Sequence, residues 1–235
     1  MSRQTITLAA LAGMSACAHA SLVSFASDRD SGSYTFTGSG RQIHDAADQL
    51  DPLLLLVDDD NGPLQTLVFE TEFDADFLIS GYQSVNVGGG VLHVYNISGS
   101  FAFLDRNTGA PLMTASFTEG SLTVLGTQGA WASTATIQVG DGAPNASIAY
   151  TWLGQNLPGY GLFTGQESVG LDDAAFTLTF LQSAQGFGVP IDQSGLPLDT
   201  WLSEGSFSGS AFFAPAPSSV ALLALGGLVA NRRKR

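Results

Sequence analysis

The stretch from Leu67 to Ile79 constrains the fold more than any other part of the chain, because apolar and acidic side chains alternate along it. Successive side chains of a β-strand point to opposite faces of the sheet. The pattern therefore predicts a strand with one face in a core and the other in solvent. The expected core face carries Leu67, Phe69, Thr71, Phe73, Ala75, Phe77 and Ile79, and the expected outer face carries Glu70, Glu72, Asp74 and Asp76.

Shorter alternating or apolar runs recur along the chain and predict further strands. These runs are Tyr34 with Phe36, and residues 53–57, 91–103, 112–117, 134–139, 146–152, 175–181 and 206–213. Turn signals predict hairpins around residues 105–109 and around residues 141–144. Residues 41–50 are expected to form one or two helical turns, which Pro52 ends.

About eight to ten strands with turns at short intervals predict an all-β fold. We expect an antiparallel β-sandwich of jelly-roll type, with a closed β-barrel as the alternative, and a short hydrophobic helix at the C-terminal end. Residues 21–214 contain no long Pro-, Ser- or Gly-rich linker and no repeat of fixed period, so one domain is expected there.

This body is strongly acidic. All 21 acidic residues lie within it, and only Arg29, Arg41 and Arg106 are basic, which gives a net charge of −18. Such a surface repels phosphate backbones, so nucleic acid is not an expected partner. The apolar content and the 15 phenylalanines favour a packed core over disorder.

The row of carboxylates from Glu72 to Asp76 is somewhat like the Glu-x-Asp-x-Glu strand of jelly-roll retaining glycosidases. Such an enzyme needs two carboxyl groups about 5 to 5.5 Å apart, whereas residues four apart on a strand are separated by roughly 13 Å. No tryptophan lies nearby in the sequence to stack on a sugar. We expect a solvated outer face and no catalytic residues, with a retaining glycosidase as the alternative.

Acidic turns suggest calcium as a ligand, because carboxylate and amide oxygens are its usual partners. The main candidate is Asp58, Asp59, Asp60 and Asn61, followed by Asp28-x-Asp30-x-Gly32, Asp105-x-Asn107-x-Gly109 and the pair Asp172-Asp173. None of them continues to the glutamate that closes an EF-hand loop. Asp and Asn in turns also cap the backbone through Asx hydrogen bonds, which is the competing interpretation. No other cofactor is expected.

Nucleophilic and phosphate chemistry have little support. His44 and His93 are the histidines of the body, and His93 falls on a core-facing strand position, which indicates a packed residue. Gly88-Gly89-Gly90 lacks the Lys-Ser/Thr of a phosphate loop. Trp131, Trp152 and Trp201 are able to stack on sugars, but single tryptophans in β-rich proteins usually pack in the core or at its rim.

The N-terminal segment has the parts of a secretory signal peptide. Arg3 supplies a positive charge, residues 6–16 are apolar, and Ala18-His19-Ala20 is a small-residue cleavage site. We expect signal peptidase to remove residues 1–20, so that the mature chain begins at Ser21. Cys17, the only cysteine, is lost with this segment. A lipid attached at Cys17 is the alternative.

The C-terminal segment, residues 215–235, has three parts. Pro215-Ala216-Pro217 precedes an apolar run at residues 220–230, and the chain ends in Arg232-Arg233-Lys234-Arg235. Eleven residues of helix span about 17 Å, well short of a hydrocarbon core of about 30 Å. The four cations favour a cytoplasmic position for this end.

These three parts resemble the PEP-CTERM sorting signal, which an exosortase recognises and processes in Gram-negative bacteria. Ala216 departs from the usual Pro-Glu-Pro. The resemblance implies an exosortase-like processing enzyme as a partner, transient anchoring in the inner membrane, and release or transfer to the cell surface. It covers only this tail and implies no activity for the body.

Taken together, these features predict an exported cell-surface or extracellular-matrix protein with a structural or adhesive role. The alternative is a carbohydrate-binding or carbohydrate-hydrolysing β-sandwich whose partner is extracellular polysaccharide.

Overall fold

The computed structural model describes residues 19–26, 34–47, 52–58, 64–140, 146–170 and 172–213. The predicted signal peptide up to residue 18, the predicted sorting tail and its hydrophobic helix lie outside these ranges.

Within the described ranges the chain is all-β, with a single 3₁₀ turn at Pro158–Tyr160 and no α-helix. Fourteen strands join in one sheet, and the paired strands are antiparallel, as the sequence predicts. Five of these strands were not expected from the sequence, namely His19–Ala26, Gln42–Asp45 and three strands of two residues each. The strands are β1 (His19–Ala26), β2 (Phe36–Ser39), β3 (Gln42–Asp45), β4 (Leu53–Asp58), β5 (Leu67–Val87), β6 (Gly90–Asp105), β7 (Pro111–Thr127), β8 (Ala130–Gly140), β9 (Ser147–Trp152), β10 (Gln166–Glu167), β11 (Asp173–Ser183), β12 (Gly186–Phe187), β13 (Val189–Pro190) and β14 (Trp201–Phe213).

The strand pairings form a closed ring. From β1 they run through β4, β5, β6, β7, β8, β11 and β14 and return to β1. A second path of pairings links β14 to β5 through the short hairpin of β2 and β3: β2 pairs with β14, and β3 pairs with β5. The long strands β5 and β7 each have two successive partners on one side, β4 then β3 for β5 and β9 then β8 for β7.

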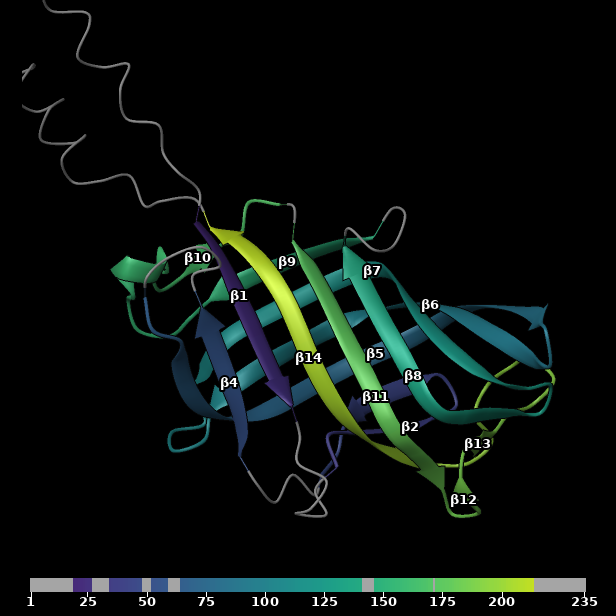
Figure 1. Cartoon of the computed structure of the whole chain (residues 1–235). Helices are drawn as coiled ribbons and strands as arrows, with labels where there is room; N and C mark the ends of the chain where they lie inside the picture. Colours follow the sequence, from purple (N-terminus) through teal and green to yellow (C-terminus); the bar gives the residue numbers. More distant parts are fainter. Residues whose placement is uncertain are drawn as a thin grey trace, which may run out of the picture.

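Two layers of strands cross each other (Figure 1). In the view of Figure 1, β1, β14, β11 and β8 run diagonally in front of β5, β6, β7 and β9. Phenylalanines from both layers meet between them. The ring of Phe176 on β11 lies 4.9 Å from that of Phe207 on β14 and 5.2 Å from that of Phe101 on β6. The core is thus an aromatic cluster that holds the layers together.

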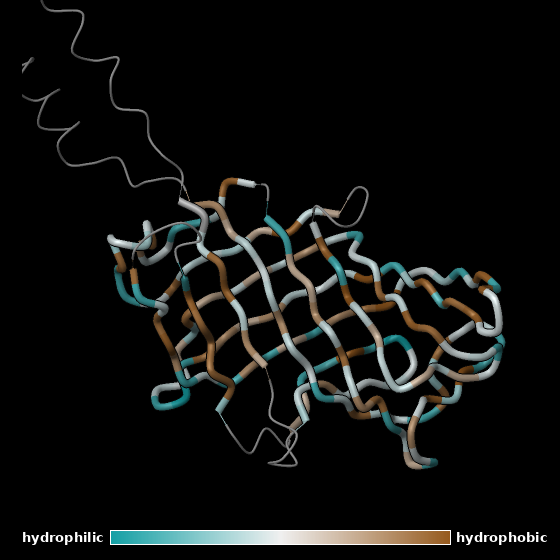
Figure 2. Tube along the Cα trace, viewed as in Figure 1, coloured by the Kyte–Doolittle hydropathy of each residue, from teal (hydrophilic) through white to brown (hydrophobic). Residues whose placement is uncertain are grey.

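The strand predicted at Leu67 to Ile79 is confirmed as the first part of β5. Phe73, Ala75, Phe77 and Ile79 are buried, while the acidic residues between them are exposed. Figure 2 shows the same alternation of hydrophobic and hydrophilic positions along the strands of both layers. The apolar face packs on the phenylalanine cluster, because burial of apolar area is the main favourable term in folding.

Beyond the phenylalanine cluster, β5–β8 extend into a distal end, which we define as residues 81–96 and 121–131. Its interior is polar and aromatic. The Tyr95 hydroxyl donates to the Gly195 carbonyl at 2.6 Å and accepts from the Trp131 indole at 2.7 Å. The His93 ring is buried, and its Nδ1 lies 3.0 Å from the Tyr82 hydroxyl and its Nε2 2.7 Å from the Thr127 carbonyl. His93 is therefore the packed, hydrogen-bonded residue that the sequence predicts.

The helical turns predicted at residues 41–50 are wrong over the part that is described. Gln42–Asp45 is strand β3, which pairs with β2 on one side and β5 on the other. Ile43 is fully buried. Two ladders of backbone hydrogen bonds and the burial of Ile43 override a weak local helical pattern.

The hairpin predicted around residues 141–144 is also wrong. β8 pairs with the second half of β7 and with β11, whereas β9 pairs with the first half of β7. The two strands share β7 as a neighbour and belong to different parts of the sheet. The hairpin predicted at residues 105–109, between β6 and β7, is confirmed.

The first and last strands lie side by side, with His19 paired to Phe213 and Ala26 paired to Ser206. The expected first strand at Tyr34 and Phe36 is thus preceded by another, which the sequence analysis missed. The start of β1 and the end of β14 consequently lie next to each other, at the end of the sheet remote from the distal end (Figure 1).

We expect Phe176→Ala to lower the free energy of unfolding by about 3 to 5 kcal/mol, the usual cost of removing a buried aromatic ring. Its ring contacts Phe36, Phe73, Phe77, Phe101 and Phe207. Urea unfolding monitored by circular dichroism measures the effect. Phe187→Ala is the matched control, because that side chain is 72% exposed. An equal loss in both variants would contradict the assigned core.

Candidate functional site

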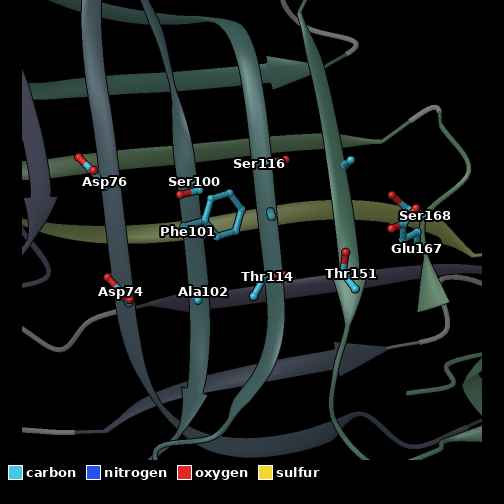
Figure 3. A pocket seen from close by; sticks show the side chains of 12 residues that line it. Asp74, Asp76, Ser100, Phe101, Ala102, Thr114, Ser116, Thr151, Glu167 and Ser168 are labelled. Carbon is cyan, nitrogen blue, oxygen red and sulfur yellow. The ribbon is translucent and has the colours of Figure 1, made fainter. Parts of the chain in front are cut away.

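A groove crosses the outer face of β5, β6, β7, β9 and β10, on the side opposite the phenylalanine cluster (Figure 3). Its volume is about 460 Å³, and it is open to solvent. Carboxylates stand at both ends, short polar or methyl side chains line the middle, and two buried residues of the core face, Phe101 and Ala115, also border it. The lining residues are Asp74, Asp76, Ser100, Phe101, Ala102, Thr114, Ala115, Ser116, Ala149, Thr151, Glu167 and Ser168.

Strand register brings these residues together in two parallel rows. One row pairs Asp74 with Ala102, then Thr114, Thr151 and Glu167 in turn. The adjacent row pairs Asp76 with Ser100, then Ser116 and Ala149. Because directly opposite residues on antiparallel strands lie about 5 Å apart, each row is a continuous track across the sheet.

Local sequence explains both the exposure and the hollow. Asp74 and Asp76 alternate with buried Phe73, Ala75 and Phe77, so the core face of β5 forces the acids outward. The equivalent outer positions on β6, β7 and β9 hold Ala, Ser or Thr, which are too short to fill the space between the carboxylates. The groove is therefore a consequence of side-chain size on a pleated sheet.

One end of the groove carries a histidine. Nδ1 of His44 on β3 lies 3.4 Å from Oδ1 of Asp76, and both side chains are substantially exposed. An exposed pair of this kind contributes little to stability. His44 is the residue of β3 that stands next to the Asp76 end of the groove.

The described residues that line the groove include hydrogen-bonding groups and no positively charged side chain. Carboxylates accept hydrogen bonds, and the hydroxyls of Ser100, Ser116, Thr114 and Thr151 both donate and accept. This set suits a ligand rich in hydroxyl or amino groups. Phosphate and carboxylate ligands are disfavoured, since Asp74, Asp76 and Glu167 would repel them.

The carboxylate row predicted from the sequence is only partly in the groove. Asp74 and Asp76 line it, whereas Glu70 and Glu72 do not. Trp131, Trp152 and Trp201 are fully buried, so none of them forms a sugar platform there. The interpretation of the tryptophans as core residues is confirmed.

Five lining residues were not predicted from the sequence: Ser100, Thr114, Ser116, Thr151 and Glu167. Ser and Thr at alternate positions of predicted strands were the available signal. Their convergence depends on β9 pairing with the first half of β7, and the sequence analysis placed β9 in a hairpin with β8 instead.

Most of the main calcium candidate, Asp59, Asp60 and Asn61, lies outside the described residues, as does Asp28-x-Asp30-x-Gly32. Oδ2 of Asp58 accepts a hydrogen bond from the Thr66 hydroxyl at 3.4 Å. Within the part of the chain that the structure describes, no group of three or more His, Cys, Asp or Glu residues is placed to hold a metal ion.

Two of the other acidic candidates make backbone contacts. Oδ1 of Asp105 accepts hydrogen bonds from the amides of Asn107 and Thr108 and from the Thr108 hydroxyl, at 2.9 to 3.0 Å. This is the Asx cap that was the competing interpretation. Asp172 and Asp173 accept from the amides of Phe212 and Ser210 on β14, at 2.9 and 2.7 Å. All three carboxylates therefore fix strands and turns.

The structure also reveals an Asx turn at Asp192 that the sequence analysis did not single out. Its Oδ1 accepts from the Ser194 amide at 2.8 Å and from the Leu196 amide at 2.9 Å. The Ser194 hydroxyl also donates to this oxygen, at 2.7 Å. This hydrogen bond is the main cause that lowers the pKa of the Asp192 carboxyl, and the backbone amides add to it. The turn shapes the loop whose Gly195 carbonyl receives the Tyr95 hydroxyl.

No family model, curated protein or solved structure matches this chain. The class that the fold itself defines is an all-β domain with an acidic surface and a polar groove on its outer sheet face. No helix among the described residues has the length and apolar character needed to cross a membrane.

We expect Asp105 to titrate below 3.8, its ordinary pKa, because the Thr108 hydroxyl and then the backbone amides stabilise the ionised form. A carboxyl with a lowered pKa in the folded state adds stability above its unfolded pKa, and that stability is lost as the pH falls through the folded pKa. Carboxyl NMR titration measures the value.

Thr108→Val removes the hydroxyl hydrogen bond that lowers the pKa of Asp105 most, and it should move that pKa back towards 3.8. Thr118→Val is the matched control, because the Thr118 hydroxyl bonds instead to Ser147 on β9. If Asp105 titrates at its ordinary value in the wild type, the cap described above is wrong.

Proposed function

We propose that this protein is an exported cell-surface or matrix protein with an adhesive or structural role, and that it binds extracellular polysaccharide in the groove on β5, β6, β7, β9 and β10. The single observation that carries the proposal is the groove itself, with carboxylates at both ends and a hydroxyl-lined middle. The proposal includes no hydrolysis.

The charge of the groove defines the class of polysaccharide. Asp74, Asp76 and Glu167 form a negative site on a body that is already strongly acidic. Polymers of uronic acids and sulfated sugars are repelled. Neutral sugars, and sugars that carry free amines, match the lining because their hydroxyl and ammonium groups donate to carboxylates.

The shape of the groove suits a chain. The row from Asp74 to Glu167 crosses five neighbouring strands, and strands lie about 4.8 Å apart, so the track is roughly 19 Å long. That length accommodates several sugar units. Without an exposed aromatic platform among the lining residues, recognition rests on hydrogen bonds, which favours modest affinity for each site and adhesion through many sites.

Export is proposed from the two terminal signals of the sequence. The pairing of β1 with β14 is compatible with cleavage at both ends of the chain. After removal of residues 1–20 and of the tail, the two strands remain paired from Ser21 to Ala26. A C-terminal tether at this position would also present the distal end away from its attachment point.

We further propose that the fold is a β-sandwich, because the two layers enclose one phenylalanine core. A jelly-roll order is less well supported, since β5, β6, β7 and β8 follow one another as a meander. The closed ring of pairings, by contrast, favours the alternative of a closed β-barrel, because the two sheets of a sandwich are not joined by strand pairing at both sides.

We expect Asp74→Ala with Asp76→Ala to weaken binding to a neutral glucan and to a glucosamine oligosaccharide by at least about tenfold, the usual consequence of losing hydrogen bonds to charged groups. Affinity electrophoresis in gels that contain each glycan measures the change. Alginate, a uronate polymer, should bind neither form.

Glu70→Ala with Glu72→Ala is the matched control, since it removes the same charge from the same strand face outside the groove. Equal weakening in both double variants would assign the effect to general charge. Absence of binding by the wild type to every glycan would refute the proposed function.

We also expect the intact mass of the native protein in culture medium to correspond to a chain that starts at Ser21 and lacks the apolar tail. Mass spectrometry of membrane and medium fractions reads both ends at once. A full tail in every fraction would contradict exosortase-type processing and would leave the glycan proposal standing.

A further inference from the structure

The last part of β5, residues 81–87, is an unprotected sheet edge. Earlier in the same strand, β4 pairs with residues 67–71 and β3 with residues 76–78. From Gly81 to Val87, β6 is the only strand partner among the described residues. Residues 83–87 are exposed. Alternate N–H and C=O groups of such an edge point into solvent.

This edge lacks charged side chains and proline, two of the features that keep edge strands apart. Natural proteins protect edges with charged side chains, proline or a covering loop. Residues 77–104 contain no Asp, Glu, Lys, Arg or Pro, and residues 120–140 contain none either. Charge is thus missing from the distal end of a protein that carries 21 acidic residues.

The outer face beside the edge is apolar. Val85, Leu92 and Leu125 are paired directly across β5, β6 and β7 and form one row. Val85 is 53% exposed and Leu125 is 51% exposed. Close by, a hollow of about 560 Å³ is lined by Val87, Leu125, Trp131 and glycines. An exposed apolar row next to an open edge is a surface that another chain is able to cover.

Charge identifies the partner that fits this surface. Residues 21–214 of two copies, with a net charge of −18 each, repel one another over most of their surfaces. The uncharged edge and its outer face are where the copies approach with the least repulsion. One acid lies close to this end: Asp192 begins the turn whose Gly195 carbonyl accepts the hydrogen bond from Tyr95. Identical antiparallel edges are also self-complementary about a two-fold axis.

We propose that two copies of this protein associate through residues 81–87 of β5, which extend the sheet across a two-fold axis while the Val85 rows of both copies merge into one apolar face. The contact lies at the end remote from His19 and Phe213, so two tethered copies on facing surfaces are able to meet through it (Figure 1). This inference is independent of the groove and of its glycan.

The test is sedimentation equilibrium of the full chain in a non-ionic detergent, comparing wild type, Val85→Lys and Val68→Lys. We expect a wild-type dimer that strengthens with salt, because salt screens the repulsion between the acidic bodies. Val85→Lys should raise the dimer dissociation constant by at least about tenfold, since it places two cations opposite or diagonal to each other across the axis.

Val68→Lys is the matched control. Val68 is 57% exposed on the same strand, but it is paired with Leu56 of β4 and lies outside the edge. It should leave the dissociation constant within about twofold of the wild-type value, well under one kcal/mol. An equal effect of the two variants, which would indicate association through the tail or through general charge, would overturn the proposal, as would a monomeric wild type.

Amide hydrogen exchange on the wild type gives a second measurement that does not depend on a variant. Outward-facing amides of residues 81–87 should exchange at least about tenfold more slowly at a protein concentration that favours the dimer than at one that favours the monomer. Concentration-dependent protection elsewhere, with none in this segment, would contradict the assignment and would point to another contact.

Discussion

The phenylalanine cluster between the two layers is the interaction on which the rest of the structure depends. Phe176 and Phe207 from one layer meet Phe73, Phe77 and Phe101 from the other, with ring centroids 5.2 to 6.0 Å apart in the pairs between layers. Each such pair adds about 0.5 to 1.5 kcal/mol to the burial of the rings themselves. Since the cluster fixes which face of β5 and β6 points inward, it also fixes which side chains reach solvent.

The groove and the distal end are two outcomes of that constraint. Near the cluster, the outward positions of β5 carry acids while those of β6, β7 and β9 carry short polar side chains, so a negative, hydroxyl-lined track results. Further along, the interior changes to Tyr82, His93, Tyr95 and Trp131, whose polar atoms pair with one another and with backbone carbonyls. There the outward positions are uncharged and one strand edge is open. The molecule therefore separates a polar binding face from an apolar contact surface.

Strands with clear alternation were predictable, and their partners were not. The pattern from Leu67 to Ile79 gave the core face of β5 correctly because side-chain period depends only on backbone geometry. The failures at Gln42–Asp45 and at β8 with β9 share a cause: each strand is stabilised by neighbours distant in sequence. For the site, Asp74 and Asp76 were recognisable as an outward pair. Ser100, Thr114, Ser116 and Thr151 were not, because their importance arises only when β9 joins β7.

By itself, the sequence determined the all-β class, the antiparallel pairing, the acidic surface and the inward direction of the aromatic side chains, since all of these follow from composition and local periodicity. Tertiary structure alone decided which strands pair, and therefore that carboxylates from β5 and β10 face each other across a hydroxyl-lined groove. It also decided that residues 81–87 of β5 extend past β3 and β4 as an open edge. Strand pairing is set by hydrogen bonds between residues distant in sequence and by the simultaneous burial of both layers. A local sequence pattern does not determine either of them.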